Sequence, residues 1–186
     1  MSNNLIKRAA YVNQLKDYVN TDFVKVYTGI RRSGKTSLMY NIIDELKSMG
    51  VKDENIIFIS FESREYNQID SSEKLDEIVY NKTENIKGKI YLFFDEIQQV
   101  KGWEKSINSY RVSIDSDIYI TGSNSKLLSG ELATLLTGRF LTINVYPFSF
   151  KEFIQYKNEI EGVEINEYSI AKLYDEYFNF GGMPGI

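Results

Sequence analysis

One loop in the sequence combines glycines, a lysine and a hydroxyl in a fixed order. From Gly29 to Thr36 the residues read GIRRSGKT, the glycine, four residues, Gly-Lys-Thr spacing of a phosphate-binding loop. Glycines let the backbone wrap an anion, and successive N–H groups followed by a helix N-terminus attract it. In this arrangement Lys35 would contact the β- and γ-phosphates and Thr36 would ligate Mg²⁺. The alternative is a glycine turn that matches by accident, and the flanking strand and helix patterns favour the phosphate loop. The expected nucleotide-binding residues are Gly29, Ile30, Arg31, Arg32, Ser33, Gly34, Lys35, Thr36 and Ser37.

Two adjacent carboxylates follow a second apolar run. The segment IYLFFDEIQ ends its apolar part at Asp95-Glu96, and carboxylates at the tips of parallel strands lie where such sheets bind ligands. With the loop upstream, Asp95 is the expected Mg²⁺ partner and Glu96 the expected base for an attacking water. Alone, the pair would indicate only a helix cap or a surface pair.

Two weaker signals accompany these motifs. The segment YITGSNS places Ser123, Asn124 and Ser125 after another apolar strand, where they either orient water and phosphate or cap a helix. Arg139 precedes a fifth strand, either as a solvated or structural residue or as an arginine that stabilises transition-state charge. The pair Arg31-Arg32 is either solvated or helps to neutralise the triphosphate.

These residues require strands and helices in alternation. Strands are predicted over residues 23–29, 55–62, 89–97, 117–125 and 140–150, with helices over 5–20, 35–50, 71–80, 103–112, 126–138, 150–157 and 167–180. Such alternation predicts βαβ crossovers and a parallel sheet covered by helices, an α/β fold. The closing segment FNFGGMPGI is typical of a connection to a further region.

Composition narrows the chemistry. The 186 residues contain no Cys and no His, and their net charge is −4. Disulfides, thiolate nucleophiles, imidazole bases and His- or Cys-based metal sites are therefore excluded. The balanced charge argues weakly against a dedicated nucleic-acid surface. No apolar run has the length of a membrane span, and we expect a cytoplasmic protein.

The motifs together resemble those of AAA+ superfamily ATPases, and more narrowly the archaeal and bacterial group related to STAND ATPases. The shared series is GIRRSGKT, IYLFFDEIQ, Trp103-Glu104, YITGSNS, LLTGRF and YPFSFKEF. The resemblance extends from Leu5 to Pro184, and the string from Gly138 to Glu152 is its most specific part. It implies a five-stranded parallel sheet in the order 5-1-4-3-2.

The resemblance also implies roles for residues. The loop from Gly29 to Thr36 becomes the Walker A motif, Asp95 the Walker B aspartate and Glu96 the catalytic glutamate. Asn124, with Ser123 as competitor, becomes the first sensor, and Arg139 lies near the position of an arginine finger that acts in cis or in trans. A second sensor arginine would belong to a helical lid, but residues 171–180 contain none.

The expected organisation is an ATPase core over residues 1–148 and a helical segment over 149–186 that begins a lid or a linker. In the resembling group a winged-helix or nuclease-like region follows. The first functional hypothesis is an ATP- and Mg²⁺-dependent hydrolase, in a possible homo-oligomer, whose nucleotide cycle drives a conformational switch or remodelling. The second is a nucleotide-gated binding module with little or no turnover. ATP is preferred to GTP because the Asn-Lys-x-Asp base-recognition motif does not occur.

Overall fold

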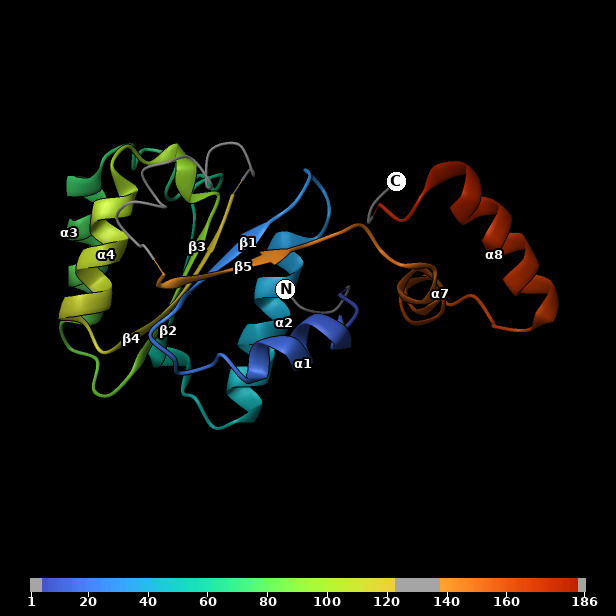
Figure 1. The fold of residues 1–186 in the computed structure, drawn as a ribbon, viewed down its shortest axis with the longest axis horizontal. Coiled ribbons are helices and arrows are strands. Elements are labelled where there is room, and N and C mark those ends of the chain that lie inside the picture. Colours follow the sequence, from blue (N-terminus) through green and yellow to red (C-terminus); the bar gives the residue numbers. More distant parts are fainter. Residues whose placement is uncertain (1–4, 123–137, 184–186) are drawn as a thin grey trace.

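The computed structural model describes residues 5–122 and 138–183, which fold around one parallel sheet (Figure 1). Its strands are β1 (Val24–Thr28), β2 (Ile56–Ser60), β3 (Ile90–Asp95), β4 (Ser116–Thr121) and β5 (Phe140–Asn144). They lie in the order β2-β3-β4-β1-β5, and all four pairings are parallel. The α/β class and the expected strand order are confirmed.

Helices cover both faces of the sheet (Figure 1). One face packs against α3 (Ser72–Thr83) and α4 (Trp103–Ser113), through residues such as Val79 and Ile107. The other packs against α1 (Ala9–Lys16) and α2 (Lys35–Ser48), through Leu15 and Leu38 among others. Because β3 is buried at every position, its sequence is apolar up to its last residue, Asp95, rather than alternating. β1 is also buried throughout, and its Lys25 forms an ion pair with the buried Asp117.

The strand register brings the carboxyl ends of four strands to one edge of the sheet. Ser60 of β2 pairs with Asp95 of β3, and Tyr27 of β1 pairs with Thr121 of β4. The loop from Gly29 to Gly34 leaves β1 at this edge and leads directly into α2. Residues distant in sequence therefore meet where a parallel sheet binds its ligands.

All five strands end before the residue that the sequence predicts, and the third and fifth show the physical reason. We predicted the third strand over 89–97, but β3 ends at Asp95 because Glu96 takes a left-handed backbone, with φ 58° and ψ 44°. We predicted the fifth over 140–150, but β5 ends at Asn144, where its neighbour β1 also ends. Pro147 then removes a backbone donor, and Ser149 caps the next helix.

The first helix is also shorter than predicted. Residues 5–20 were expected to be helical, yet α1 covers only Ala9–Lys16. Arg8 precedes it in a non-helical conformation, and its backbone N–H donates to Oδ1 of Asn41 at 2.8 Å. Ile6 is buried in a separate cluster with Phe148 and Phe153. These contacts hold the chain before Ala9 outside the helix.

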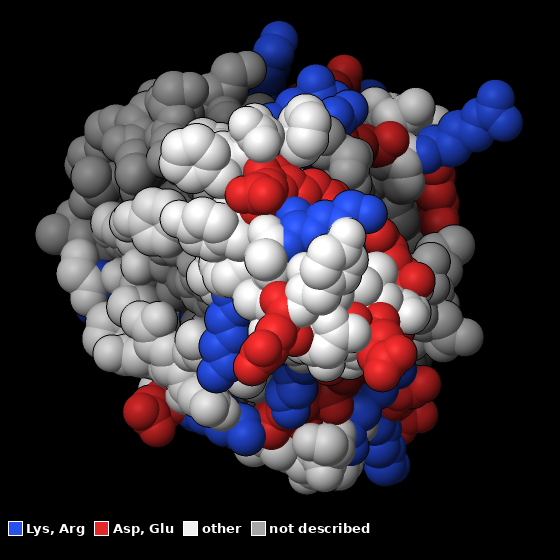
Figure 2. Space-filling model, turned by 90° about the vertical axis from the view of Figure 1, so that its right-hand side faces the viewer, with Lys and Arg blue, Asp and Glu red and all other residues white. Residues whose placement is uncertain are grey.

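Helices α7 (Phe150–Glu159) and α8 (Glu167–Phe180) extend from one end of the α/β core (Figure 1). Leu173 of α8 packs with Phe153 of α7, whereas Tyr174 and Phe178 stack on each other at the surface. Seen from this end, acidic and basic side chains are interspersed among uncharged ones (Figure 2). None of the helices that the structure describes is long and apolar enough to cross a membrane.

Candidate functional site at the carboxyl edge of the sheet

The loop between β1 and α2 is built on two glycines in special conformations. Gly29 has φ 151°, and a Cβ added to it would lie 2.3 Å from the carbonyl oxygen of Val145. Gly34 has φ 94° and directly precedes α2. No residue with a side chain fits at Gly29 without a backbone shift, and a left-handed φ favours glycine at Gly34. The backbone conformation of the loop therefore requires glycine at the first position of the motif and favours it at the second.

The lysine of the loop lies inside it. Lys35 is buried, and its ammonium group donates to the carbonyl oxygens of Gly29 and Ile30, both at 3.2 Å. The carboxylate of Glu96 lies 4.0 Å from the same ammonium group. One positive charge is therefore held between the loop backbone and the acid that the sequence predicted as the base.

Asp95 is the centre of a cluster of hydroxyl groups. Its carboxylate accepts hydrogen bonds from Thr36 at 2.9 Å, Thr121 at 2.7 Å and Ser60 at 3.1 Å. These donors come from the start of α2 and from the ends of β4 and β2, and Asp95 is only 4% exposed. Three donors fix the orientation of the carboxylate toward the loop.

Glu96 reaches the same site by a turn of its own backbone. Adjacent residues of an extended strand point to opposite faces, so Asp95 and Glu96 can share a site only where the strand ends. The left-handed conformation of Glu96 makes this turn without a glycine, and its N–H donates to the Thr121 hydroxyl at 2.9 Å. The Glu96 side chain, which is 21% exposed, accepts a hydrogen bond from the Gln98 amide.

A cleft of about 340 Å³ joins the two motifs. The described residues that line it are Arg31, Arg32, Gly34, Lys35, Thr36, Ser37, Glu62 and Glu96. Arg31 and Arg32 are exposed at its rim, which is compatible with either interpretation of this pair.

The residues present fit a magnesium ion. Mg²⁺ prefers hard oxygen ligands, and in nucleotide sites it binds one or two protein groups together with phosphates and water. The Thr36 hydroxyl and the Asp95 carboxylate supply two such oxygens in contact with each other. Among the described residues no group of three or more Asp and Glu forms a metal site on its own, so a cation here would also need the phosphates.

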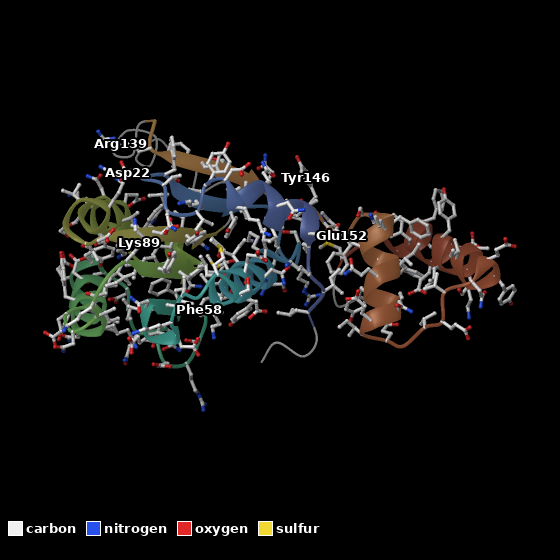
Figure 3. The ribbon with its side chains drawn as sticks, turned by 90° about the horizontal axis from the view of Figure 1, so that it is seen from below. Asp22, Phe58, Lys89, Arg139, Tyr146 and Glu152 are labelled. Atoms are coloured by element: carbon white, nitrogen blue, oxygen red, sulfur yellow. The ribbon has the colours of Figure 1, made fainter. Side chains whose placement is uncertain are left out.

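Of the expected site residues, Arg139 lies away from the cleft and Asn124 falls outside the described residues. Asn124 and its neighbours Ser123 and Ser125 lie outside the described residues, as does the helix predicted over 126–138, except for Gly138. Arg139 stands at the start of β5, where its carbonyl oxygen accepts from the N–H of Val24. That is the amino end of β1, opposite to the loop, and Figure 3 shows Arg139 at the same end of the molecule as Asp22 and Lys89.

The sequence reasoning missed three polar residues at the site. Thr121 contacts both Asp95 and Glu96, Ser60 contacts Asp95, and Glu62 lines the cleft. Their positions in the sequence could have predicted them, because each residue lies at or just beyond the carboxyl end of an apolar strand, where polar side chains of neighbouring strands converge.

Comparison with known proteins agrees with this geometry. The model of the AAA domain family matches residues 21–154. An uncharacterized protein of Haemophilus influenzae is 45% identical over 186 residues, which are 100% of this chain and 46% of that protein. The uncharacterized protein MJ1544 of Methanocaldococcus jannaschii is 36% identical, over 98% of this chain and 40% of its own length. The chain thus spans less than half the length of these relatives.

Solved structures share the fold at low sequence identity. The Walker-type ATPase PABY2304 of Pyrococcus abyssi has a TM-score of 0.60 at 17% identity, covering 96% of this chain and 64% of its own. The Aeropyrum pernix ORC1 protein in complex with DNA has a TM-score of 0.60 at 10% identity, covering 94% and 57%. With the family match over the core and its loop, these likenesses support a nucleotide-binding P-loop fold. The chain belongs to the AAA domain family.

Proposed function

We propose that this chain binds ATP together with Mg²⁺ and hydrolyses it in a cycle that changes the position of its C-terminal helices. One observation carries the proposal: Lys35, Thr36 and Glu96 line a single cleft at the carboxyl edge of the sheet, and the buried Asp95 accepts a hydrogen bond from Thr36 beside it. A phosphate loop alone would support binding. An acid held beside it adds a group that can accept a proton.

Each residue has a distinct task in the proposed reaction. Lys35 and the loop N–H groups bind the phosphate oxygens and stabilise the charge that develops as the terminal P–O bond breaks. Glu96 accepts a proton from the water that attacks the γ-phosphorus. Thr36 and Asp95 would hold Mg²⁺, which neutralises phosphate charge when bound.

A second candidate function is a nucleotide-gated binding module with little or no turnover. Two observations favour it. Gln98 donates to Oε2 of Glu96, so one carboxylate oxygen that could contact a water is already engaged, and α8 supplies no arginine that could act as a second sensor. The proposed boundary near Ser149, with residues 149–186 as the start of a lid or linker, serves either function.

The test of nucleotide binding is Lys35→Ala, with Lys47→Ala as the matched control on the same helix. Lys47 is exposed and pairs with Asp53, remote from the cleft. Loss of a charge-assisted contact costs about 1.5–3 kcal/mol, so we expect the dissociation constant for ATP–Mg²⁺ to rise at least about tenfold in Lys35→Ala. Titration calorimetry measures both variants. Equal affinity in Lys35→Ala and the parent protein would refute the loop assignment.

The two functions are separated by single-turnover hydrolysis. An ATPase converts bound ATP to ADP and phosphate at a rate that depends on Glu96, whereas a binding module retains ATP. Phosphate release that is no faster than spontaneous ATP hydrolysis at every protein concentration would favour the second function.

A further inference from the structure

Arg8 is the largest fully buried side chain of the described residues, and neither sequence motif includes it. It lies in the segment before α1, at the junction between the α/β core and α7. Figure 3 marks this junction by Tyr146 and Glu152, which lie where the core meets the C-terminal helices.

The guanidinium group of Arg8 joins three segments. Its Nη1 donates to the carbonyl oxygen of Ser33 at 3.1 Å, in the phosphate loop. Its Nη2 donates to the carbonyl oxygen of Tyr146 at 3.0 Å. Its Nε and Nη2 donate to the two carboxylate oxygens of Glu152, at 2.8 and 3.2 Å. Only the planar fork of an arginine can make a two-point contact with a carboxylate and also reach two carbonyls.

The contact with Ser33 orients the next peptide group. All described peptide bonds are trans, so the carbonyl of Ser33 and the N–H of Gly34 point in opposite directions. With the carbonyl held by Arg8, the N–H of Gly34 is directed away from Arg8, and Gly34 itself lines the cleft. Arg8 thereby fixes a donor of the phosphate loop from behind.

The contact with Glu152 acts on the first turn of α7. Glu152 forms a capping box with Ser149, whose N–H donates to Oε2 of Glu152 at 2.8 Å. The same carboxylate therefore starts α7 and binds the arginine that holds the loop. A contribution to stability is a weak explanation for this buried ion pair. The desolvation of two buried charges often costs more free energy than their attraction returns.

We propose that Arg8 is a positioning residue that links the phosphate loop to α7, so that nucleotide binding at the loop and the order of α7 depend on each other. This inference rests on the proposed nucleotide binding and adds its route to the C-terminal helices. Thermodynamic linkage makes this coupling reciprocal: if bound nucleotide stabilises the junction, then an ordered junction raises the affinity for nucleotide by the same factor.

Three variants separate the two contacts. Arg8→Lys keeps the charge but cannot bridge Ser33 and Glu152 together. Glu152→Gln removes the ion pair and leaves Ser33 in contact with Arg8. Lys7→Ala is the control, because Lys7 adjoins Arg8 and pairs with Glu45 of α2 at the surface. We expect the dissociation constant for ATP–Mg²⁺ to rise about tenfold in Arg8→Lys and to stay within about twofold in Lys7→Ala.

Hydrogen exchange detects the link itself. In the parent protein, saturating ATP–Mg²⁺ should slow amide exchange in residues 29–36 and also in residues 150–159. In Glu152→Gln the loop should still respond, and the response of residues 150–159 should be lost. A purely structural role would instead speed exchange in α7 equally with and without nucleotide and leave its response intact.

Two results would overturn the inference while leaving the proposed function in place: parent-like affinity in Arg8→Lys, or nucleotide binding to the parent with no response in residues 150–159. Failure of the parent to bind ATP would refute the proposed function instead, and this inference with it. If Arg8→Lys does not fold, the exchange data for the parent and for Glu152→Gln decide the question.

Discussion

At the scale of single residues, the site assigns different surroundings to two neighbouring acids. Asp95 is buried and accepts from three hydroxyl groups, whereas Glu96 is partly exposed and borders the cleft. A metal ligand must keep a fixed orientation, and a base must reach water. The surroundings therefore match the proposed roles.

Replacing Glu96 by Gln separates these roles. Glutamine keeps the volume of the side chain but cannot accept a proton from water at neutral pH. We expect affinity for ATP–Mg²⁺ within about threefold of the parent and single-turnover hydrolysis about 10²-fold slower. Quench-flow with labelled ATP measures the rate, and Glu62→Gln, at the same cleft, is the control. If Glu62→Gln is slow and Glu96→Gln is not, Glu62 is the base.

At the scale of elements, the capping box of α7 gives the junction a dependence on pH. Burial alone would raise the pKa of Glu152, but hydrogen bonds from Arg8 and Ser149, with the charge of Arg8, outweigh it and hold the pKa below its ordinary value of 4.5. The ionised carboxylate therefore stabilises the folded state above pH 4.5, and this contribution is lost as pH falls through the lowered pKa.

We expect this loss to be visible against Glu152→Gln. From neutral pH to about pH 3 the free energy of unfolding should fall more in the parent than in the variant, because only the parent loses the ionised Glu152. Urea titrations at a series of pH values measure the difference. Parallel pH profiles would contradict it, since the other carboxylates titrate in both proteins.

Helices, strands and loops could be predicted from the sequence where a short local pattern defines them. The loop GIRRSGKT, the apolar strand before Asp95 and the helix Glu167–Phe180 follow from short patterns, and the structure confirms the last at the same bounds. The strand order came from the family resemblance. A turn at Glu96 is required by the sequence if both acids share one site, but no glycine marks it, and the structure makes it with a left-handed glutamate.

The contact between Arg8 and Glu152 could not be predicted either, because 144 residues separate the two in sequence. From sequence alone, an arginine beside a helical pattern that becomes buried in an ion pair cannot be told apart from an arginine that stays exposed to solvent. The narrower likeness to STAND-related ATPases, and the region that follows in that group, stay predictions.

At the scale of the whole molecule, Arg139 lies at the wrong end of the sheet to act on its own loop. Its carbonyl pairs with Val24, and the loop follows Thr28, about 13 Å away along β1 at ~3.3 Å per residue. A role in hydrolysis therefore requires a second copy that presents Arg139 to the cleft of its neighbour, as arginine fingers do in trans.

This arrangement predicts hydrolysis that depends on assembly. Turnover per chain should rise with protein concentration in the parent and stay flat in Arg139→Ala, while ATP affinity is unchanged. The control is Lys89→Ala, which removes another cation from the same end of the sheet. Steady-state rates over a range of protein concentration test this. Weakened ATP binding with unchanged turnover would make Arg139 a ground-state or structural residue.

The left-handed backbone of Glu96 also bears on how stability and activity trade against each other. A glutamate in this conformation costs about 1–2 kcal/mol, and asparagine tolerates it better. We therefore expect Glu96→Asn to raise the melting temperature by a few degrees, as seen for gains of about 1 kcal/mol in domains of this size, while hydrolysis is lost. An unchanged or lower melting temperature would mean that contacts of the Glu96 side chain offset the strain. A screen of variants of this chain for thermal stability alone would thus tend to replace Glu96, and the proposed base would be lost.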